Sequence, residues 1–221
     1  MMGDSGPELV TPDDIDINDP PFPLTSIDRE ILATRDEDYH RITWDDLKSI
    51  IASNQLEQLK RLPSDLRKYL AWSYNIKKQY GGITNYVIKE RLRWTPISDS
   101  GPPLFEHVSE TPFEVRSDYA VLLNDWPYGF EDGIAHILVW SKTPIKVDDT
   151  RGDVTEESRE LIEKFVKEFF ISELGEGGGD RVLWFKNWVS LQSVRGVDHV
   201  HVLVKDAPKE LMGKWLARKD L

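Results

Sequence analysis

The period of the hydrophobic pattern changes once along the chain, at a proline-rich segment from residue 95 to 112. Before this segment, apolar residues recur at the three- and four-residue spacing of amphipathic helices. After it, short runs of apolar and β-branched residues separated by turn residues are typical of β-strands. One later run, residues 155–170, returns to the helical spacing. The order predicts an α+β fold, with a helical N-terminal part followed by an antiparallel sheet and one helix packed on it.

Local signals set the expected boundaries. Thr43 is the predicted N-cap of the first helix, Ser64 is the predicted N-cap of a second helix after Pro63, and Gly81 with Gly82 ends that helix. A third helix is expected over residues 83–94, strands over 119–123, 135–140, 181–194 and 197–205, and a terminal helix over 208–221.

Three segments are expected from this pattern. Residues 1–36 are rich in Pro, Asp and Ser and predict a disordered or extended acidic arm. Residues 37–112 form the helical part with its proline-rich loop, and residues 113–221 form the sheet part. We expect the last two segments to fold as a single compact unit, because 221 residues fit one ordinary domain.

Composition excludes several classes of function. The net charge of −11 argues against nucleic-acid binding, which needs a basic surface. The N-terminal residues lack the features of a signal peptide, and no apolar run approaches the roughly 18 residues of a membrane span. The absence of cysteine fits a reducing compartment. We expect a cytoplasmic protein, with the nucleus as a second compartment and no membrane partner.

The segment VSLQSVRGVDHVHVLVK, residues 189–205, carries the strongest functional signal. His199 and His201 alternate on an expected strand and so share one face, while Val200, Val202 and Val204 share the other. A histidine near neutral pKa can act as a nucleophile or proton carrier at phosphorus. No third ligand follows at a suitable local spacing, so no metal site is predicted.

Polar residues near this strand in the sequence suggest a nucleotide site. Amide and hydroxyl groups can bind ribose or phosphate, and cations can neutralise phosphate charge. Asp198 shares the valine face in a regular strand, but a bulge at Gly196 would turn it toward the histidines as a base, and Asp125 is the competing base. The candidates for nucleotide and phosphate binding are Asn187, Gln192, Ser193, Arg195, Lys186 and Lys142; those for the substrate pocket are Asn124, Trp126, Tyr128 and Arg91. Arg61, Tyr69 and Tyr80 are further candidates for its wall, and His136 is expected to be a hydrogen-bonded structural histidine.

The order NDWPYGFEDGIAHILVWSK, then a helix, then N…QSV…HVHVLV resembles the histidine-triad (HIT) domain over residues 118–205. This resemblance implies a HIT-like sheet and a phosphate-binding histidine strand. Two of the three triad histidines are present. If they match the last two triad positions, His199 is the nucleophile; if they match the first two, it is His201.

The runs ITWDDLKSIIASNQLEQLKRLPSDLRKYLAW, YGGITNYVIKERLRW, HILVWSKTPI and LWFKNWVSLQSVRGVDHVHVLV resemble the fungal N-acetylglucosamine-induced protein family, a domain of unknown function. This second resemblance covers nearly the whole chain after residue 36 and implies a link to amino-sugar metabolism.

Together the two resemblances imply a phosphotransferase that phosphorylates N-acetylglucosamine with a nucleoside triphosphate, either ATP or a pyrimidine nucleotide such as CTP, with Mg²⁺ as its metal. The expected partners are therefore a nucleotide and an amino sugar. Two alternatives stay open at this point: a HIT-type nucleotide hydrolase or nucleotidyl transferase, and a non-catalytic sensor of a sugar or nucleotide.

Overall fold

A four-stranded antiparallel sheet forms the centre of the protein. The structure is a computed structural model, and it describes residues 9–98, 100–148, 150 and 152–217. The strands are β1 (Tyr119–Leu123), β2 (Ile134–Ser141), β3 (Val182–Phe185) and β4 (Asp198–Lys205), in the order β1-β2-β4-β3. All three pairings are antiparallel. The predicted α+β class, with helices preceding an antiparallel sheet, is confirmed.

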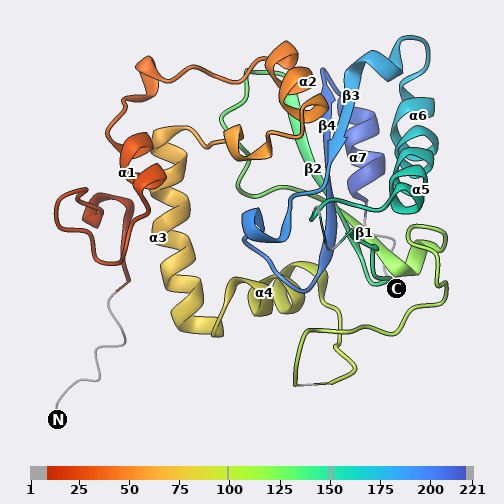
Figure 1. Cartoon of the computed structure of the whole chain (residues 1–221), viewed down its shortest axis with the longest axis horizontal. Helices are drawn as coiled ribbons and strands as arrows, with labels where there is room; N and C mark the ends of the chain where they lie inside the picture. Colours follow the sequence, from red (N-terminus) through yellow and green to blue (C-terminus); the bar gives the residue numbers. More distant parts are fainter. Residues whose placement is uncertain (1–8, 99, 149, 151, 218–221) are drawn as a thin grey trace.

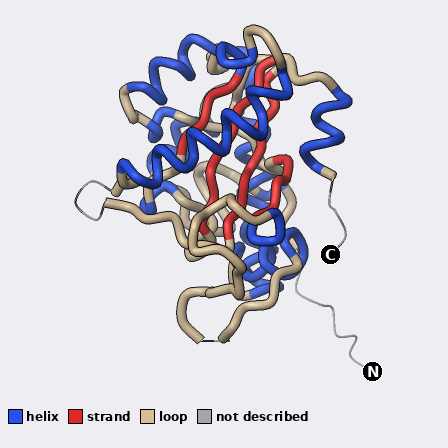
Figure 2. The backbone as a smooth tube through the Cα atoms, turned by 90° about the vertical axis from the view of Figure 1, so that its right-hand side faces the viewer, coloured by secondary structure: helices blue, strands red, loops and turns tan. Residues whose placement is uncertain are grey.

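One face of the sheet is closed by the C-terminal helices. Helix α5 (Glu156–Val166) continues through a π-helical turn (Lys167–Ile171) into α6 (Ser172–Leu174), and α7 (Lys209–Leu216) follows β4. Figure 1 shows these helices together on one side of the strands, and Figure 2 shows helices crossing in front of them. Val200, Val202 and Val204 are buried in this core with Phe170 and Trp215, as the alternation of β4 predicts.

The N-terminal helices lie on the opposite side of the sheet (Figure 1). They are α2 (Trp44–Ala52), α3 (Pro63–Tyr80) and α4 (Ile83–Tyr86), and α4 continues as a π-helix over Val87–Leu92. Aromatic and aliphatic side chains from α4 pack with Trp140 of β2. This side therefore has its own apolar layer, but it also receives the face of β4 that carries the two histidines.

The helix boundaries follow local chemistry. Thr43 accepts a hydrogen bond from the Asp46 amide and caps α2, as predicted, and Gly81 ends α3 in the left-handed conformation with φ of 74°. Ser64 is not a cap, contrary to prediction. Helix α3 begins with Pro63 as its first residue, because proline has no N–H to leave unpaired and its fixed φ suits that position.

The N-terminal segment is more ordered than its composition predicts. Residues 1–8 lie outside the described residues, but residues 9–36 contain α1 (Ser26–Leu32), which Thr25 caps. Ile15, Ile31 and Leu32 are buried against α3. The expected disordered or extended arm is thus not what the structure shows over residues 9–36, because three well-placed apolar residues outweigh the surrounding prolines and aspartates.

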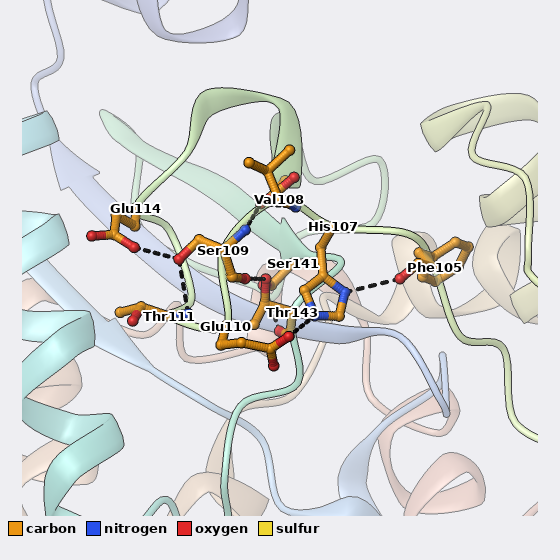
Figure 3. Close-up of polar contacts among 10 residues, drawn as sticks. Phe105, His107, Val108, Ser109, Glu110, Thr111, Glu114, Ser141 and Thr143 are labelled. Carbon is orange, nitrogen blue, oxygen red and sulfur yellow. Dashed lines mark hydrogen bonds and ion pairs between the residues drawn. The ribbon is translucent and has the colours of Figure 1, made fainter.

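The loop from α4 to β1 is held by side-chain to backbone hydrogen bonds. Asp118 is 1% exposed, and its carboxylate accepts the Val108 and Ser109 amides at 2.8 and 2.9 Å. Figure 3 shows the contacts around Ser109, whose hydroxyl reaches Glu114 and whose carbonyl accepts the Thr143 hydroxyl at 3.0 Å. His107 nearby bonds the Phe105 carbonyl. The bond from Thr143 to Ser109 fixes the loop against the end of β2.

Within the described part of the chain, no helix is both long and apolar enough to cross a membrane.

Candidate functional site

A cavity of about 220 Å³ lies between the histidine face of the sheet and helices α3 and α4. Its floor comes from β1, β2 and β4, its walls from α3, from α4 with its π-helical extension, and from the turn after β1. Pockets that enclose drug-sized ligands measure about 300–1,000 Å³, so this one suits a single sugar or nucleoside ring. A π-helical segment in the wall is notable because such segments are frequent at functional sites.

His199 lies on the floor of the cavity with one ring nitrogen committed. Its Nδ1 lies 2.9 Å from the Val197 carbonyl oxygen, which can only accept, so Nδ1 carries the proton. In the neutral ring, Nε2 then has a free lone pair, and it makes no hydrogen bond to any described residue. His199 is 6% exposed as a residue, and its ring packs on Trp140 at 4.4 Å between centroids. His199 is thus held in the tautomer that a nucleophile or a base requires.

His201 belongs to a buried chain of polar side chains behind His199. Its Nδ1 lies 2.8 Å from Nε2 of His136, and its Nε2 lies 3.2 Å from the side-chain nitrogen of Asn187. The Asn187 amide also donates to the Tyr128 hydroxyl at 3.1 Å. Asn124 lies at the other end, 3.2 Å from Nδ1 of His136. The expectation that His136 is a hydrogen-bonded structural histidine is met, and it brings a third imidazole to the site from the neighbouring strand.

The three imidazoles are neutral at physiological pH. Burial lowers the pKa of His136 to about 3 and the pKa of His199 to about 4. Burial also lowers the pKa of His201 well below its ordinary value, and the adjacent His136 and His199 rings lower it further. Uncharged imidazoles at pH 7 can accept protons or attack an electrophile, but they do not by themselves attract an anion.

Aromatic rings form much of the wall. Trp126 packs against Trp72 and Tyr69 with centroids 5.2 and 5.7 Å apart, and Trp72 packs edge-on against Tyr86. All four rings line the cavity. Flat aromatic faces suit the apolar face of a sugar ring or a nucleobase.

Among the described residues, four charged ones line the cavity, and two of them, Arg91 and Asp125, form an ion pair. Arg91 donates to the Asp125 carboxylate at 2.8 Å, and the Asp125 side chain is 46% exposed. Arg61 and Glu57 also line the cavity. The Arg61 guanidinium lies 3.9 Å over the Tyr69 ring.

Unpaired polar atoms gather around the same cavity. In the described residues, four buried side-chain atoms have no hydrogen-bond partner, and three of them belong to cavity-lining residues: Nε1 of Trp126, Nε1 of Trp140 and Oδ1 of Asn187. Buried polar atoms are almost always paired, so this clustering indicates a place where water or a ligand completes the bonding.

The family model described as "Protein of unknown function (DUF3605)" matches residues 43–205. The chain belongs to this family. The match takes in helices α2 to α4 and the whole sheet, and it therefore contains every residue that lines the cavity.

Curated relatives confirm the resemblance to N-acetylglucosamine-induced proteins. The chain is 32% identical over 187 residues to N-acetylglucosamine-induced protein 1 of Candida albicans, with 79% of this chain and 72% of that protein covered. It is 31% identical over 178 residues to the uncharacterized protein YPL067C of Saccharomyces cerevisiae, with 80% and 85% covered. The crystal structure of HTC1 matches with a TM-score of 0.54 and 29% identity, over 79% of this chain and 90% of that chain.

In this member of the DUF3605 family, the structure brings nine of the fourteen predicted site residues together. The nine that line the cavity are His199, His201, Asp125, Asn187, Ser193, Asn124, Trp126, Tyr128 and Arg91. They come from four separate stretches of the chain: the π-helix after α4, the turn after β1, the segment between β3 and β4, and β4 itself.

The other five predicted residues do not line the cavity. Asp198 accepts the Ile145 amide at 2.9 Å and pairs with Lys186 at 2.9 Å, and β4 pairs regularly with β2 from Asp198 onward, so the expected bulge that would turn Asp198 toward the histidines is not formed. Lys142 lies 5.6 Å over the Trp94 ring. Gln192 donates to the Asn187 carbonyl at 2.8 Å, and Arg195 is exposed, with its carbonyl bonded to Thr84.

Sequence reasoning missed several wall residues. Trp72, Tyr86 and Trp140 look like ordinary apolar core positions in the sequence. Trp72 follows Tyr69 by three residues, which places both on one face of α3. This helical spacing, close in the sequence to Arg61, is the signal that could have predicted Trp72 as a wall residue. Tyr80, proposed as a wall residue, lies outside the lining set and contacts Glu90 instead.

The described residues contain no group of three histidine, aspartate or glutamate side chains placed to hold a metal. Mg²⁺ is usually held by one or two carboxylates together with substrate phosphates and water. Glu57 lines the cavity and is the carboxylate that would fit this role, with substrate phosphates and water supplying the remaining ligands.

Proposed function

We propose that this protein is a nucleotide-dependent phosphotransferase that phosphorylates N-acetylglucosamine or a related amino sugar. The observation that carries the proposal is His199, a neutral imidazole with a free Nε2 at the floor of a cavity walled by tryptophan and tyrosine. The relative named N-acetylglucosamine-induced protein 1 supports the choice of sugar. A HIT-like core is part of the proposal, because β2 and β4 place three histidines on one face of the sheet.

In the proposed reaction, the aromatic wall holds the sugar ring and the nucleotide's triphosphate lies toward the cavity mouth. A sugar hydroxyl oxygen attacks the terminal phosphorus, the bond to the leaving diphosphate oxygen breaks, and the hydroxyl proton passes to a base. Asp125 is the base that the geometry favours, since Asp198 is engaged with Lys186 outside the cavity. Mg²⁺ bound to the phosphates would neutralise charge on the transferring group.

His199 fits this reaction as an uncharged acceptor at the transferring group. Its Nδ1 bond to Val197 fixes the ring, so Nε2 would be placed to accept a hydrogen bond from the sugar hydroxyl. The same lone pair could attack phosphorus, and that is the basis of the alternative, a nucleotide hydrolase or nucleotidyl transferase with a covalent histidine intermediate.

The test is a turnover and thermal-unfolding panel on the full chain that crosses ATP, CTP, GTP and UTP with and without N-acetylglucosamine and Mg²⁺. Mass spectrometry detects the sugar phosphate, and a ligand at ~100 times its Kd stabilises by about 2.7 kcal/mol. We expect one nucleotide to stabilise the protein and to be consumed only with the sugar present.

Two other results lead to the alternatives. Nucleotide consumption without sugar, together with a trapped histidine adduct, selects the hydrolase or nucleotidyl transferase. Binding of sugar or nucleotide without any turnover selects a non-catalytic sensor and ends the phosphotransferase proposal.

A further inference from the structure

Arg61 is a fixed cation at the cavity wall. It lies in the segment between α2 and α3, two residues before Pro63, and its Nε donates to the Trp126 carbonyl at 3.3 Å. Its guanidinium plane sits over the Tyr69 ring at 3.9 Å and lies 5.5 Å from the Tyr128 ring centre. Stacking on one ring and bonding to one carbonyl hold the side chain in place without using its two terminal nitrogens.

Arg61 has no acidic partner among the described residues, and its terminal nitrogens make no hydrogen bond there. Other arginines of the chain use theirs: Arg67 donates to the Ile15 carbonyl, Arg159 pairs with Asp153, and Arg91 pairs with Asp125. A partly buried guanidinium with two unused donor groups is set up for an oxyanion, such as a phosphate, two of whose oxygens accept parallel hydrogen bonds.

The other lining residues of the cavity offer little positive charge to a ligand, so the charge of Arg61 matters more for binding an anion. Its imidazoles are neutral, no lysine is among its described lining residues, and the charge of Arg91 is offset by Asp125. Lys186, Lys142 and Arg195, the cations that the sequence suggested for phosphate, all lie outside the lining set. Arg61 is therefore the cation that remains available to a ligand inside.

We propose that Arg61 is the anchor for a phosphate oxyanion of the bound ligand, gripping two of its oxygens side by side. This inference rests on the proposed function for the identity of the ligand, because the phosphate belongs either to the nucleotide's triphosphate or to the phosphorylated sugar product. It does not rest on turnover, since anchoring is a binding property of the cavity.

The experiment titrates tripolyphosphate and, separately, N-acetylglucosamine 6-phosphate into the full-length protein by calorimetry. Four proteins are compared: the native chain, Arg61→Gln, Arg61→Lys and the control Lys68→Gln. Lys68 is a matched loss of one positive charge, since it lies on α3 in an exposed pair with Asp65 and outside the cavity. Thermal unfolding of each variant reports whether the fold is kept. If Arg61→Gln does not fold, the comparison is made between the native chain and Arg61→Lys.

We expect Arg61→Gln to weaken binding of at least one of the two anions by about ten- to a hundredfold, as for the loss of a charge-assisted hydrogen-bond pair. Arg61→Lys should fall in between, because it keeps the charge without the planar fork. Lys68→Gln should bind like the native chain. Loss confined to tripolyphosphate assigns the anchor to the nucleotide, and loss confined to the sugar phosphate assigns it to the product.

Two results overturn the inference: equal anion affinity in the native chain and both Arg61 variants, or no binding of either anion by the native chain. The inference and the proposed function can fail separately. Arg61-dependent anion binding without sugar phosphorylation leaves the anchor standing and removes the phosphotransferase. If the native chain phosphorylates the sugar, and Arg61→Lys keeps the same KM for the nucleotide and the same product affinity, the phosphotransferase stands and the anchor is removed.

Discussion

At the scale of single residues, one backbone hydrogen bond decides what His199 can do. Because the Val197 carbonyl holds the proton on Nδ1, Nε2 is the reactive nitrogen, and burial keeps it unprotonated. Val197 lies directly before β4, so the segment that leads into the strand supplies this carbonyl.

The first prediction concerns His199 itself. His199→Asn should reduce turnover by about 10²–10³-fold, the range for losing one positioned hydrogen-bonding group at a reacting centre, while sugar binding stays within a few fold. Steady-state kinetics and calorimetry check this. The control is His40→Asn, which removes a histidine whose side chain is 78% exposed and lies outside the cavity; a matching fall in that variant would contradict a specific role for His199.

The two candidate bases, Asp198 and Asp125, should differ in what their loss affects: Asp198→Asn should lower stability, and Asp125→Asn should lower turnover. Asp198→Asn leaves Lys186, 5% exposed in its side chain, without its charge partner, and we expect the free energy of unfolding to fall by about 3 kcal/mol with little change in turnover per folded molecule.

Asp125→Asn, at an exposed position, should lower turnover strongly and change stability by less than about 1 kcal/mol. Denaturant titration and kinetics on both variants give the comparison. If Asp198→Asn is fully folded and still loses turnover, Asp198 is the base instead of Asp125.

What could be predicted at this scale depended on periodicity. The shared face of His199 and His201 follows from strand alternation alone. The bond from His201 to His136 does not, because it depends on the register of β2 against β4, which a single sequence does not contain. The ion pair of Asp198 with Lys186 joins β4 to the residue that follows β3, and a single sequence does not show it for the same reason.

At the scale of elements, Gly129 joins the turn after β1 to the segment around Ile42 and to the segment that carries Arg61. Its carbonyl accepts the Ile42 amide at 2.9 Å, and its amide donates to the Lys60 carbonyl at 2.8 Å. A Cβ at this position would lie 2.7 Å from a ring carbon of Tyr39 and 2.9 Å from the Leu62 backbone nitrogen. The turn after β1 and the segment that carries Arg61 are therefore fitted to a residue without a side chain.

We predict that Gly129→Ala lowers the free energy of unfolding by about 1–3 kcal/mol, because one contact is with backbone that cannot simply rotate away. Ligand affinity should fall with it, since Arg61 and Trp126 flank the junction. Urea unfolding measures the first effect and calorimetry the second. Gly179→Ala, where a Cβ meets nothing within 4 Å, is the control, and equal effects in the two variants would count against a tight junction.

Elements with strong local signals were predictable and those that depend on docking were not. The stripe of α5 and the Thr43 cap are visible in the sequence. Helix α1 is seven residues long and is marginal on its own, so its burial against α3 is a tertiary effect that composition conceals.

At the scale of the whole molecule, three buried neutral histidines couple stability to pH. In the unfolded chain they take up protons as the pH falls below about 6.5, whereas in the folded chain burial lowers the pKa of His136 to about 3, the pKa of His199 to about 4 and the pKa of His201 well below its ordinary value. The unfolded state therefore binds more protons in this window. Stability is greatest above pH 6.5 and falls as the solution becomes more acidic.

We predict that the free energy of unfolding falls between pH 6.5 and 4.5 with a slope that approaches about 1.4 kcal/mol per pH unit for each histidine. Asp46, with a pKa lowered to about 2, loses its contribution only at lower pH, and His107, with a raised pKa, acts in the opposite sense. Denaturant unfolding at several pH values measures the slope. His136→Asn should reduce the slope by the contribution of one histidine. An unfolding free energy that does not change with pH in the native chain would contradict the buried neutral cluster.

The aromatic wall described above has a practical consequence. Three of the eight tryptophans, Trp72, Trp126 and Trp140, line one small cavity. A molecule that enters it changes the polarity around all three indoles at once, and indole emission follows polarity. The chain therefore carries an intrinsic fluorescent reporter, with which unlabelled sugars, nucleosides and phosphates can be screened for binding before any reaction is known.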